Sequence, residues 1–406
     1  AALAAARSGA RTLLVEKFGA LGGLATTGLM TIFSIKTAAG TDEPIVAGIL
    51  QELVERGVEG GWAKDHKSVA VFHAEGLKRD LDALMRAASV DLLFHSFAAD
   101  VVTDGARVDA VVVATKQGPW AFRGRVFVDC TGDGDIAAWA GAPFELGRPL
   151  DGLTQPVSLM FMMCDVDMER INEYRRSGDW ELRKLVADAV AAGEMEPFES
   201  KLMGFLQDPA IPHVMYVNFT AVRGVDATNP RDMTRAEIEG RRQAKQLADV
   251  FRKRLPGCEN AKLVLTAATV GVRESRRIIG DYVLDVHDVL GCRRFEDGIA
   301  RNSFFVDIHH PEHGGLWNPR YLPRGGWHHI PYRCLLPRGL DNVLTAGRCV
   351  SATHEALGSI RVMAQCCAMG QAAGTAAAMA AAADGRPRNV DVRALQQRLR
   401  EQGAII

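Results

Sequence analysis

The first 26 residues constrain the fold more than any other part of the chain. The Ala-rich stretch 1–8 ends at Gly9, which is typical of a helix closed by a glycine. The apolar run Arg11–Val15 follows and predicts a buried parallel strand, with Glu16 at its carboxyl end. A glycine-rich loop occupies residues 19–26. A helix, a glycine turn, an apolar strand and a terminal acid form the second half of a βαβ unit, which predicts an α/β fold.

An acid at the end of such a strand has a specific chemical use. Its carboxylate can accept hydrogen bonds from both hydroxyls of an adenosine ribose. The first half of the unit would be a strand followed by G-x-G-x-x-G, whose amides hold a pyrophosphate at a helix N-terminus. That half does not occur in the sequence, so we expect the chain to be truncated at its N-terminus. The pattern alone agrees equally well with a βαβ unit that binds no nucleotide.

Two later motifs favour the nucleotide interpretation. Residues 131–136, Thr-Gly-Asp-Gly-Asp-Ile, lie between a predicted strand and a helix. The glycines allow close backbone approach, and the aspartates can bond sugar hydroxyls. Residues 346–363 lead from a strand at 342–347 into a long small-residue helix over 358–383. We expect that helix to begin near Gly358 and Ser359, where free amides and the helix dipole would stabilise an anionic group.

Local amino-acid composition divides the chain into three segments. Residues 150–334 contain more proline and long charged stretches, predicted to be helical over 167–196 and 231–254. The flanking regions share glycine- and alanine-rich strands and helices. We therefore predict a nucleotide-binding domain formed by residues 1–150 and 335–406, with a substrate domain, residues 151–334, inserted between them.

Local patterns predict the elements of the first segment. Helices are expected over 44–60, 73–88 and 135–140, and a strand over 91–94. The runs 107–114 and 120–129 alternate or are apolar, which indicates a small antiparallel unit.

The overall composition excludes several classes of protein. A net charge of -1 gives no excess charge for a nucleic acid or a membrane surface. Residues 362–383 carry no charge, but they are mostly Ala, Gly and Thr, so we expect a buried helix and no membrane span. The eight cysteines include no C-x-x-C pair, which weakens zinc, iron–sulfur and thioredoxin-like hypotheses. Reduced thiols and a cytoplasmic location are the default expectation.

The sequence resembles the FAD-dependent oxidoreductases of the glutathione-reductase-like class, and in particular their widespread bacterial group. The resemblance rests on residues 14–26, 128–135, 271–277 and 346–375, which span most of the chain in the expected order. It implies FAD as cofactor. It also implies a glutathione-reductase-like FAD-binding Rossmann domain without its first strand, and an inserted α+β substrate domain.

The resemblance further implies which residues lie along the cofactor. They come from each of the glycine-rich turns and from the expected helix start. They are Glu16 and Lys17 at the adenosine ribose, Gly22, Gly23 and Thr26 near the pyrophosphate and flavin ring, Thr131, Gly132 and Asp133 at the second glycine turn, Gly347 and Arg348 at the ribityl and pyrophosphate, and Gly358, Ser359 and Ile360 at the flavin.

Three residues are candidates for the chemistry itself. His354, just before the expected flavin-facing helix, is the preferred proton carrier, with an ordering role for its loop as the alternative. Arg273 would clamp a substrate carboxylate or carbonyl, or else belong to an ion-pair network with Glu274 at the domain interface. His329 would act as an acid or base if residues 328–333 form a loop that closes over the flavin; the alternative is a plain polar loop.

A group of histidines and acids between Asp307 and His313 suggests a metal site. Their spacing fits no metal site, and Pro311 bends the run, so we expect a solvated loop and no bound metal.

These observations favour an FAD-dependent oxidoreductase that transfers a hydride between a small organic substrate and flavin N5, with a second electron donor or acceptor as partner. One alternative is a nicotinamide-dependent dehydrogenase that uses the same half-site. Another is a truncated, non-catalytic remnant of a flavoprotein.

Overall fold

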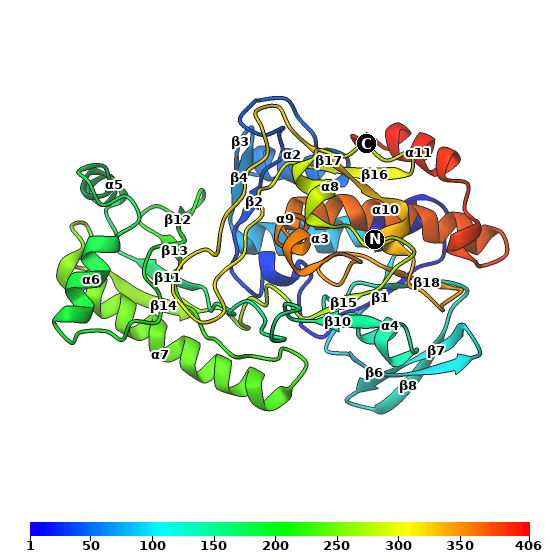
Figure 1. Ribbon diagram of the computed structural model, residues 1–406, viewed down its shortest axis with the longest axis horizontal. Coiled ribbons are helices and arrows are strands. Elements are labelled where there is room, and N and C mark those ends of the chain that lie inside the picture. Colours follow the sequence, from blue (N-terminus) through cyan, green and yellow to red (C-terminus); the bar gives the residue numbers. More distant parts are fainter.

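The computed structural model describes all 406 residues and shows a mixed α/β protein with two lobes (Figure 1). In the larger lobe, β1 (Leu13–Val15) pairs in parallel with β5 (Asp91–Leu93). A second parallel pair joins β9 (Phe127–Asp129) to β18 (Val343–Thr345). The α/β class and the strands expected at 11–15, 91–94 and 342–347 are therefore confirmed.

Helix α10 (Met363–Ala382) runs through the centre of the larger lobe (Figure 1). Most of its alanines and both of its glycines are buried, and α1 (Ala2–Arg7), α2 (Ile49–Glu59) and α11 (Val392–Glu401) pack against it. Small side chains let these helices approach closely, which explains the composition of this stretch. No helix of the protein combines the length and the apolar character that crossing a bilayer requires.

The expected single helix over 358–383 is two helices in the structure. A short helix, α9 (His354–Ile360), begins at the Thr353 cap, whose hydroxyl accepts a hydrogen bond from the Ala356 N–H. The chain then turns at Arg361 and Val362, where Val362 has an extended backbone, before α10 begins. The expected helix start near Gly358 and Ser359 is therefore wrong.

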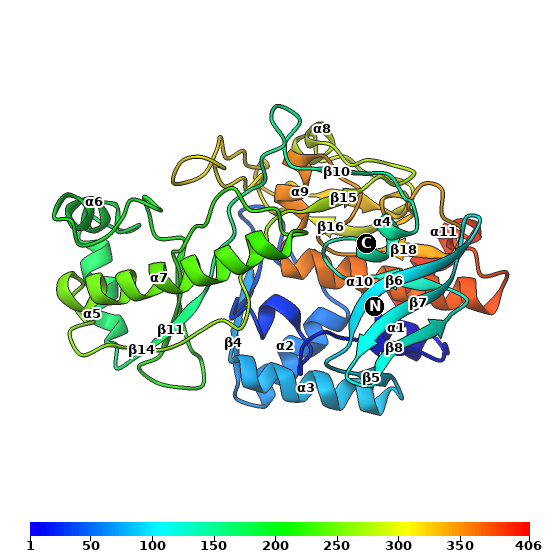
Figure 2. The same cartoon turned by 90° about the horizontal axis from the view of Figure 1, so that it is seen from below.

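Two antiparallel sheets and two helices complete the first part of the larger lobe. One sheet has the order β2 (Ile32–Ser34), β4 (Val69–Phe72), β3 (Ala63–His66), beside α3 (Ala74–Ala87). The other has the order β6 (Phe97–Asp104), β7 (Arg107–Thr115), β8 (Gly118–Arg123), next to α4 (Asp135–Trp139), and Figure 2 shows it at one end of the molecule. The small antiparallel unit expected from residues 107–114 and 120–129 is confirmed for β7 and β8. The expectation is wrong for residues 127–129, which leave that sheet to form β9.

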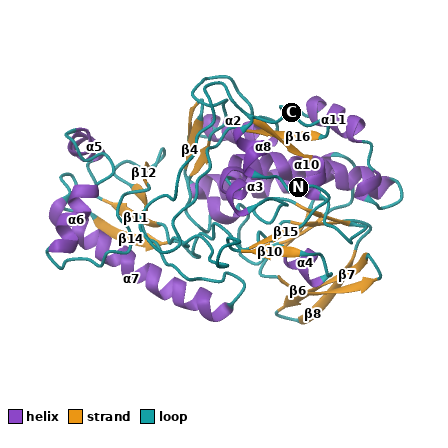
Figure 3. Ribbon diagram, in the orientation of Figure 1, coloured by secondary structure: helices purple, strands orange, loops and turns teal.

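The smaller lobe is a four-stranded antiparallel sheet with flanking helices (Figure 3). Its strands are, in order, β12 (Gly204–Gln207), β13 (Met215–Asn218), β11 (Phe161–Cys164) and β14 (Lys262–Thr266). Helices α5 (Met168–Arg176), α6 (Arg183–Ala191) and α7 (Pro230–Arg254) form in the charged stretches where helices were expected. This lobe has its own hydrophobic core.

The division at residues 151–334 stays a prediction, and the packing favours a shorter insertion. The elements after the smaller lobe are β15 (Arg276–Ile278), α8 (Val286–Leu290), β16 (Gly298–Asn302) and β17 (His328–Pro331). Strand β15 pairs with β10 (Phe144–Leu146) of the first segment. Residues 284–336 share one hydrophobic core with residues 344–399. We therefore propose that the inserted unit ends near residue 272.

A buried acid ties the two lobes together. Asp208, after β12, accepts hydrogen bonds from His73 Nδ1 and from the Tyr216 hydroxyl, both at 2.7 Å. His73 caps α3 of the larger lobe. The hydrogen bond to Asp208 raises the pKa of His73 above its ordinary value.

This contact makes the stability of the protein depend on pH. A histidine whose pKa is raised on folding contributes stability that is fully present below its unfolded pKa, about 6.5, and is lost as the pH rises through the folded pKa. We expect His73→Gln to lower the melting temperature at pH 5.5 and to have a much smaller effect at pH 8.5. Thermal melts at both pH values check this, with the exposed His287→Gln as control. If the difference in melting temperature between the wild type and His73→Gln is the same at both pH values, the prediction is contradicted.

Candidate active site

Several predicted cofactor residues follow the ends of parallel strands. Glu16 follows β1, the second glycine turn follows β9, and Gly347 with Arg348 follows β18. Ligands of open α/β sheets bind at these carboxyl edges. The charge of Lys17 is near enough to Asp133 to lower the pKa of that carboxyl. Glu16 Oε1 accepts a hydrogen bond from the Phe18 N–H at 2.9 Å, and its second carboxylate oxygen has no partner.

The second glycine turn is built around Asp129 and Thr131. The buried Asp129 carboxylate accepts from the Thr131 N–H and hydroxyl, at 3.0 and 2.7 Å. Gly132, with φ +81°, packs on the Arg348 guanidinium, which an added Cβ would meet at 2.8 Å. Asp133 accepts from Arg348 Nη1 at 2.8 Å and from the Ser275 hydroxyl at 2.6 Å. Burial alone would raise the pKa of Asp133, but these two partners bring it below its usual value.

Several glycines leave room for a cofactor. Gly23 and Gly347 have positive φ, and a Cβ added to either would meet no atom within 4 Å. Both glycines therefore face open space, and their contact with the cofactor stays a prediction. Gly22 and Thr26 face one another instead, and the Thr26 hydroxyl donates to the Leu21 carbonyl at 2.6 Å. They shape the loop, and their contact with the cofactor stays a prediction.

The three residues expected at the flavin-facing helix start point into the protein. Ile360 is fully buried in the main core. The Ser359 hydroxyl accepts from Asn302 Nδ2 at 2.7 Å and donates to the Phe304 carbonyl. Gly358 lies against Asp307 and Ile308. All three lie within α9, whereas the next free helix amides begin at Met363, so the expected role of residues 358–360 as helix-start donors is corrected.

Gly358 therefore has a packing role that can be tested. A Cβ at this position would meet Ile308 Cδ1 at 2.7 Å and the Asp307 carbonyl oxygen at 2.9 Å. Alanine favours a helix, but overpacking typically costs about 1–3 kcal/mol, so we expect Gly358→Ala to destabilise the protein by about 1–2 kcal/mol. Denaturant unfolding measures this. Gly204→Ala is the matched control because a Cβ there meets no atom within 4 Å. Equal stability of the two variants would contradict the prediction.

His354 forms the centre of a buried polar group. Its Nδ1 lies 2.7 Å from Glu274 Oε1. Glu274 also accepts a hydrogen bond from Arg277, and both Glu274 and Arg277 are almost completely buried. Because a carboxylate can only accept, Nδ1 carries a proton. Nε2 is buried and has no hydrogen-bond partner.

Arg277 is held on every side. It donates to Glu145, to the Gly147 carbonyl at 2.9 Å and to the Ala352 carbonyl at 3.1 Å, in addition to Glu274. An ion-pair network with Glu274 was expected as the alternative role of Arg273. In the structure Arg277 forms that network, and it fixes the position of Glu274.

The hydrogen-bond partners of Arg273 differ from those of Arg277. Its Nη1 donates to the Pro156 carbonyl at 2.7 Å and to the Ser158 hydroxyl at 2.9 Å, and its remaining nitrogens have no protein partner. Burial and, to a lesser degree, the charge of Arg361 lower the pKa of Arg273 to about 10. Arg361 lies at the break between α9 and α10 and donates to Asp307 Oδ2 at 2.9 Å. Arg273 thus lies next to a second guanidinium that the sequence did not single out.

The solvated loop expected over 307–313 is partly wrong. Glu312 and His313 are exposed, but Asp307 and His309 are buried beside Arg273 and Arg361. The pKa of His309 lies well below its ordinary value because burial and the neighbouring arginines disfavour its charged form. No group of three or more His, Cys, Asp or Glu side chains is arranged to hold a metal ion.

His329 lies away from this group. It is part of β17, and its Nδ1 accepts a hydrogen bond from the Phe295 N–H at 3.0 Å. Its ring packs near Trp327. Burial lowers its pKa to about 4. Residues 328–333 form a strand and the start of a short 3-10 helix, so neither the closing loop nor the plain polar loop that was expected is present.

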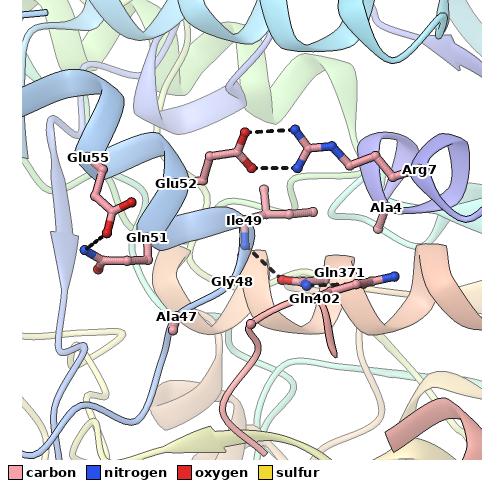
Figure 4. Close-up of a pocket in the computed structure, with 11 residues that line it drawn as sticks. Ala4, Arg7, Ala47, Gly48, Ile49, Gln51, Glu52, Glu55, Gln371 and Gln402 are labelled. Atoms are coloured by element: carbon pink, nitrogen blue, oxygen red, sulfur yellow. Dashed lines mark hydrogen bonds and ion pairs between the residues drawn. The ribbon is translucent and has the colours of Figure 1, made fainter. Parts of the chain in front are cut away.

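Two cavities lie outside the predicted cofactor residues. One, of about 460 Å³, lies between α1, α2 and α10 (Figure 4). Its polar side chains bond one another, Arg7 with Glu52 and Gln371 with Gln402. The other, of about 840 Å³, is lined by Phe304, Phe305 and Tyr321.

Comparison with protein families identifies the class of this chain. The model of the family described as FAD dependent oxidoreductase matches residues 1–399. The chain therefore belongs to the FAD dependent oxidoreductases, and FAD is its cofactor. This finding agrees with the resemblance noted in the sequence and leaves the nicotinamide alternative without support.

Three solved structures are similar to the chain at low sequence identity. A geranylgeranyl bacteriochlorophyll reductase-like protein from Thermoplasma acidophilum is 13% identical with a TM-score of 0.47, over 99% of this chain and 80% of that one. A p-nitrophenol 4-monooxygenase from Pseudomonas putida is 11% identical with a TM-score of 0.45, over 98% and 79%. A flavin-dependent brominase is 12% identical with a TM-score of 0.44, over 98% and 79%. No curated protein sequence matches the chain.

Proposed function

We propose that this protein is an FAD-dependent oxidoreductase that exchanges a hydride between a small organic substrate and N5 of the flavin. The redox chemistry is the cofactor's own, and the chain contributes binding, orientation and proton transfer. The observation that carries the proposal is the buried His354–Glu274 pair, within a chain of the FAD dependent oxidoreductase family.

His354 is the proposed proton carrier. Oxidation of an alcohol or an amine by hydride removal also releases a proton, which a base must accept. Glu274 orients the imidazole and stabilises its charged form, and Nε2 is the atom that takes the proton. The reverse reaction would use the same imidazole, protonated, as the acid. Burial of the pair excludes competing water, because both side chains are nearly inaccessible to solvent.

Arg273 is the proposed substrate contact. Its free nitrogens are donors in a planar fork, the geometry that a carboxylate or carbonyl oxygen accepts. Because Pro156 and Ser158 hold Nη1, the guanidinium is fixed before substrate arrives. This pre-organisation lowers the entropy lost on binding.

The finer fold class is also part of the proposal. Glu16 after β1, the turn after β9 and Gly347 after β18 support a glutathione-reductase-like FAD domain. The sheet of β11–β14 supports an inserted α+β unit that covers the substrate. Both statements would be tested by a structure with FAD bound.

Reconstitution with FAD tests the function. The purified chain is incubated with FAD, desalted, and examined for the visible absorption of bound oxidised flavin. Anaerobic addition of candidate alcohols, amines and acids should then bleach that absorption with at least one of them. A folded chain that retains no flavin would contradict the proposed function and support a non-catalytic remnant. Tight NAD(P)H binding without flavin would contradict it in favour of a dehydrogenase.

A further inference from the structure

Buried polar atoms without partners gather around Arg273. Protein interiors leave few such atoms, so a concentration of them needs a cause. Three occur in this group: Gln155 Nε2, Arg361 Nε and Arg223 Nε. All three are hydrogen-bond donors. A ligand that accepts hydrogen bonds would therefore satisfy these atoms, whereas a ligand that only donates would not.

Direct contacts show that these residues form one cluster. Gln155 is almost fully buried, and its Oε1 accepts from the His309 N–H at 3.1 Å. Arg361 pairs with Asp307, whose Oδ1 lies 3.6 Å from His309 Nε2. Arg273 donates to the carbonyl of Pro156, the residue that follows Gln155. The charges of Arg273, Arg361, Lys201 and Arg223 all act on His309 and disfavour its charged form.

The charges of the cluster do not balance. Arg273, Arg361 and Arg223 supply three positive charges, whereas Asp307 and Glu199 supply two negative charges. His309 is neutral because burial and the arginines hold its pKa low. The nearby buried Arg277–Glu274 pair cancels itself, and the second partner of Arg277, Glu145, is half exposed, so water screens its charge. Lys201, whose charge also acts on His309, is paired with Glu181 at 2.6 Å. One positive charge is left over, and a buried unpaired charge is costly unless a ligand neutralises it.

Solvent still reaches the cluster. The side chains of Arg361 and Asp307 keep 11% and 12% of their surface exposed, and Arg273 keeps 8%. A small anion can therefore reach these groups although the cluster lies inside the protein.

We propose that the substrate carries a carboxylate that binds between Arg273 and Arg361 and accepts the free amide hydrogens of Gln155, an inference that rests on the proposed oxidoreductase function. A carboxylate brings one negative charge, which matches the surplus, whereas phosphate would bring nearly two. Its two oxygens also suit the planar guanidinium fork.

The cluster is positioned to present the rest of the substrate to His354. The Gln155 N–H donates to Glu274 Oε2 at 3.3 Å, and Glu274 in turn holds the His354 imidazole. Gln155 and His354 thus contact the same carboxylate, that of Glu274. A hydroxy or amino acid, with its reacting group next to its carboxylate, is the substrate class that suits a carboxylate site and a proton carrier held by one residue.

Calorimetry with matched probes tests this on the FAD-loaded protein. The probes are lactate and benzoate, each compared with its neutral amide, lactamide or benzamide, together with inorganic phosphate. A charge-assisted hydrogen bond contributes enough to change affinity by about 10- to 100-fold, so at least one carboxylate should bind about 10-fold or more tightly than its amide and than phosphate. Equal affinity for acid and amide, stronger binding of phosphate, or no heat with any probe would overturn the proposal.

Gln155→Glu is the sharpest variant. It keeps the oxygen that accepts from the His309 N–H and replaces the free amide group by a negative oxygen. We expect it to weaken carboxylate binding about 10- to 100-fold. Gln117→Glu makes the same charge change on the exposed β7–β8 turn and should leave the affinity unchanged. If Gln155→Glu does not fold, Arg361→Lys takes its place, with a loss of about 10-fold expected. Unchanged affinity in the folded variant would overturn the proposal.

Failure of this inference can be told apart from failure of the proposed function. Flavin absorption is recorded on each sample, and the calorimetry is repeated on the flavin-free chain. Bound flavin without discrimination between acid and amide overturns the carboxylate site alone. Gln155-dependent carboxylate binding in a chain that takes up no flavin supports the carboxylate site and overturns the oxidoreductase function.

Discussion

Replacing His354 by asparagine should lower the rate of flavin reduction by substrate about 10²- to 10⁴-fold, the range that a general base contributes. Asparagine retains a donor at the position of Nδ1, so the hydrogen bond to Glu274 is kept while the Nε2 lone pair is lost. Binding of FAD should change little, because the role proposed for His354 is proton transfer to and from the substrate. The rate is measured by stopped-flow absorption under anaerobic conditions.

His329→Asn provides the discriminating comparison. The sequence offers both histidines as candidate acids or bases, but the structure places His329 against the Phe295 N–H and the Trp327 ring. We expect its rate to remain within about threefold of the wild type, a change of less than 1 kcal/mol in the barrier. A large loss in His329→Asn with little change in His354→Asn would overturn the assignment of the proton carrier.

Replacing Glu274 by alanine should destabilise the protein by about 3 kcal/mol or more. Arg277 has almost no exposure, and the substitution removes the partner that shares its burial. Breaking a buried pair is costly because it leaves the other charge without compensation. Glu145 remains as a second partner of Arg277, which places the effect near the lower end of the expected range. Denaturant titration followed by circular dichroism measures the loss.

Glu145→Gln tests whether the buried position of Glu274, and not its charge alone, is what stabilises Arg277. It removes the other acidic partner of Arg277, but the Glu145 side chain is half exposed, so water and salt screen the pair. A loss of less than about 1 kcal/mol is expected. If both variants lose the same stability, the buried position of Glu274 is not what stabilises Arg277.

The sequence predicted the parts of the site that depend on local pattern. Glu16, Thr131 and Gly347 each follow an apolar strand as expected, the first in the β1–β5 pair and the other two in the β9–β18 pair. The choice of His354 depended on its expected place before a helix; in the structure it is the first residue of α9, and its Nδ1 lies 2.7 Å from Glu274 Oε1. The roles of these residues stay predictions. The class of cofactor followed from the combined motifs.

The parts that were missed depend on contacts between distant segments. Gln155 and Arg361 belong to no motif, and their common feature, an unsatisfied buried nitrogen, exists only after folding. His309 was expected in a solvated loop because its neighbours are polar, yet the fold buries it among arginines. The helix break at Arg361 was missed because the small residues on its C-terminal side read as one continuous helix with those before it.

A crystal structure of the protein with bound FAD tests the account most directly. It should show the adenosine ribose at Glu16 and the flavin ring near the start of α10, with its reactive edge facing the side that holds His354, Arg273 and Arg361. A flavin ring that lies instead against β17 and His329, or in the cavity lined by Phe304, Phe305 and Tyr321 with His354 out of reach, would contradict the proposed site.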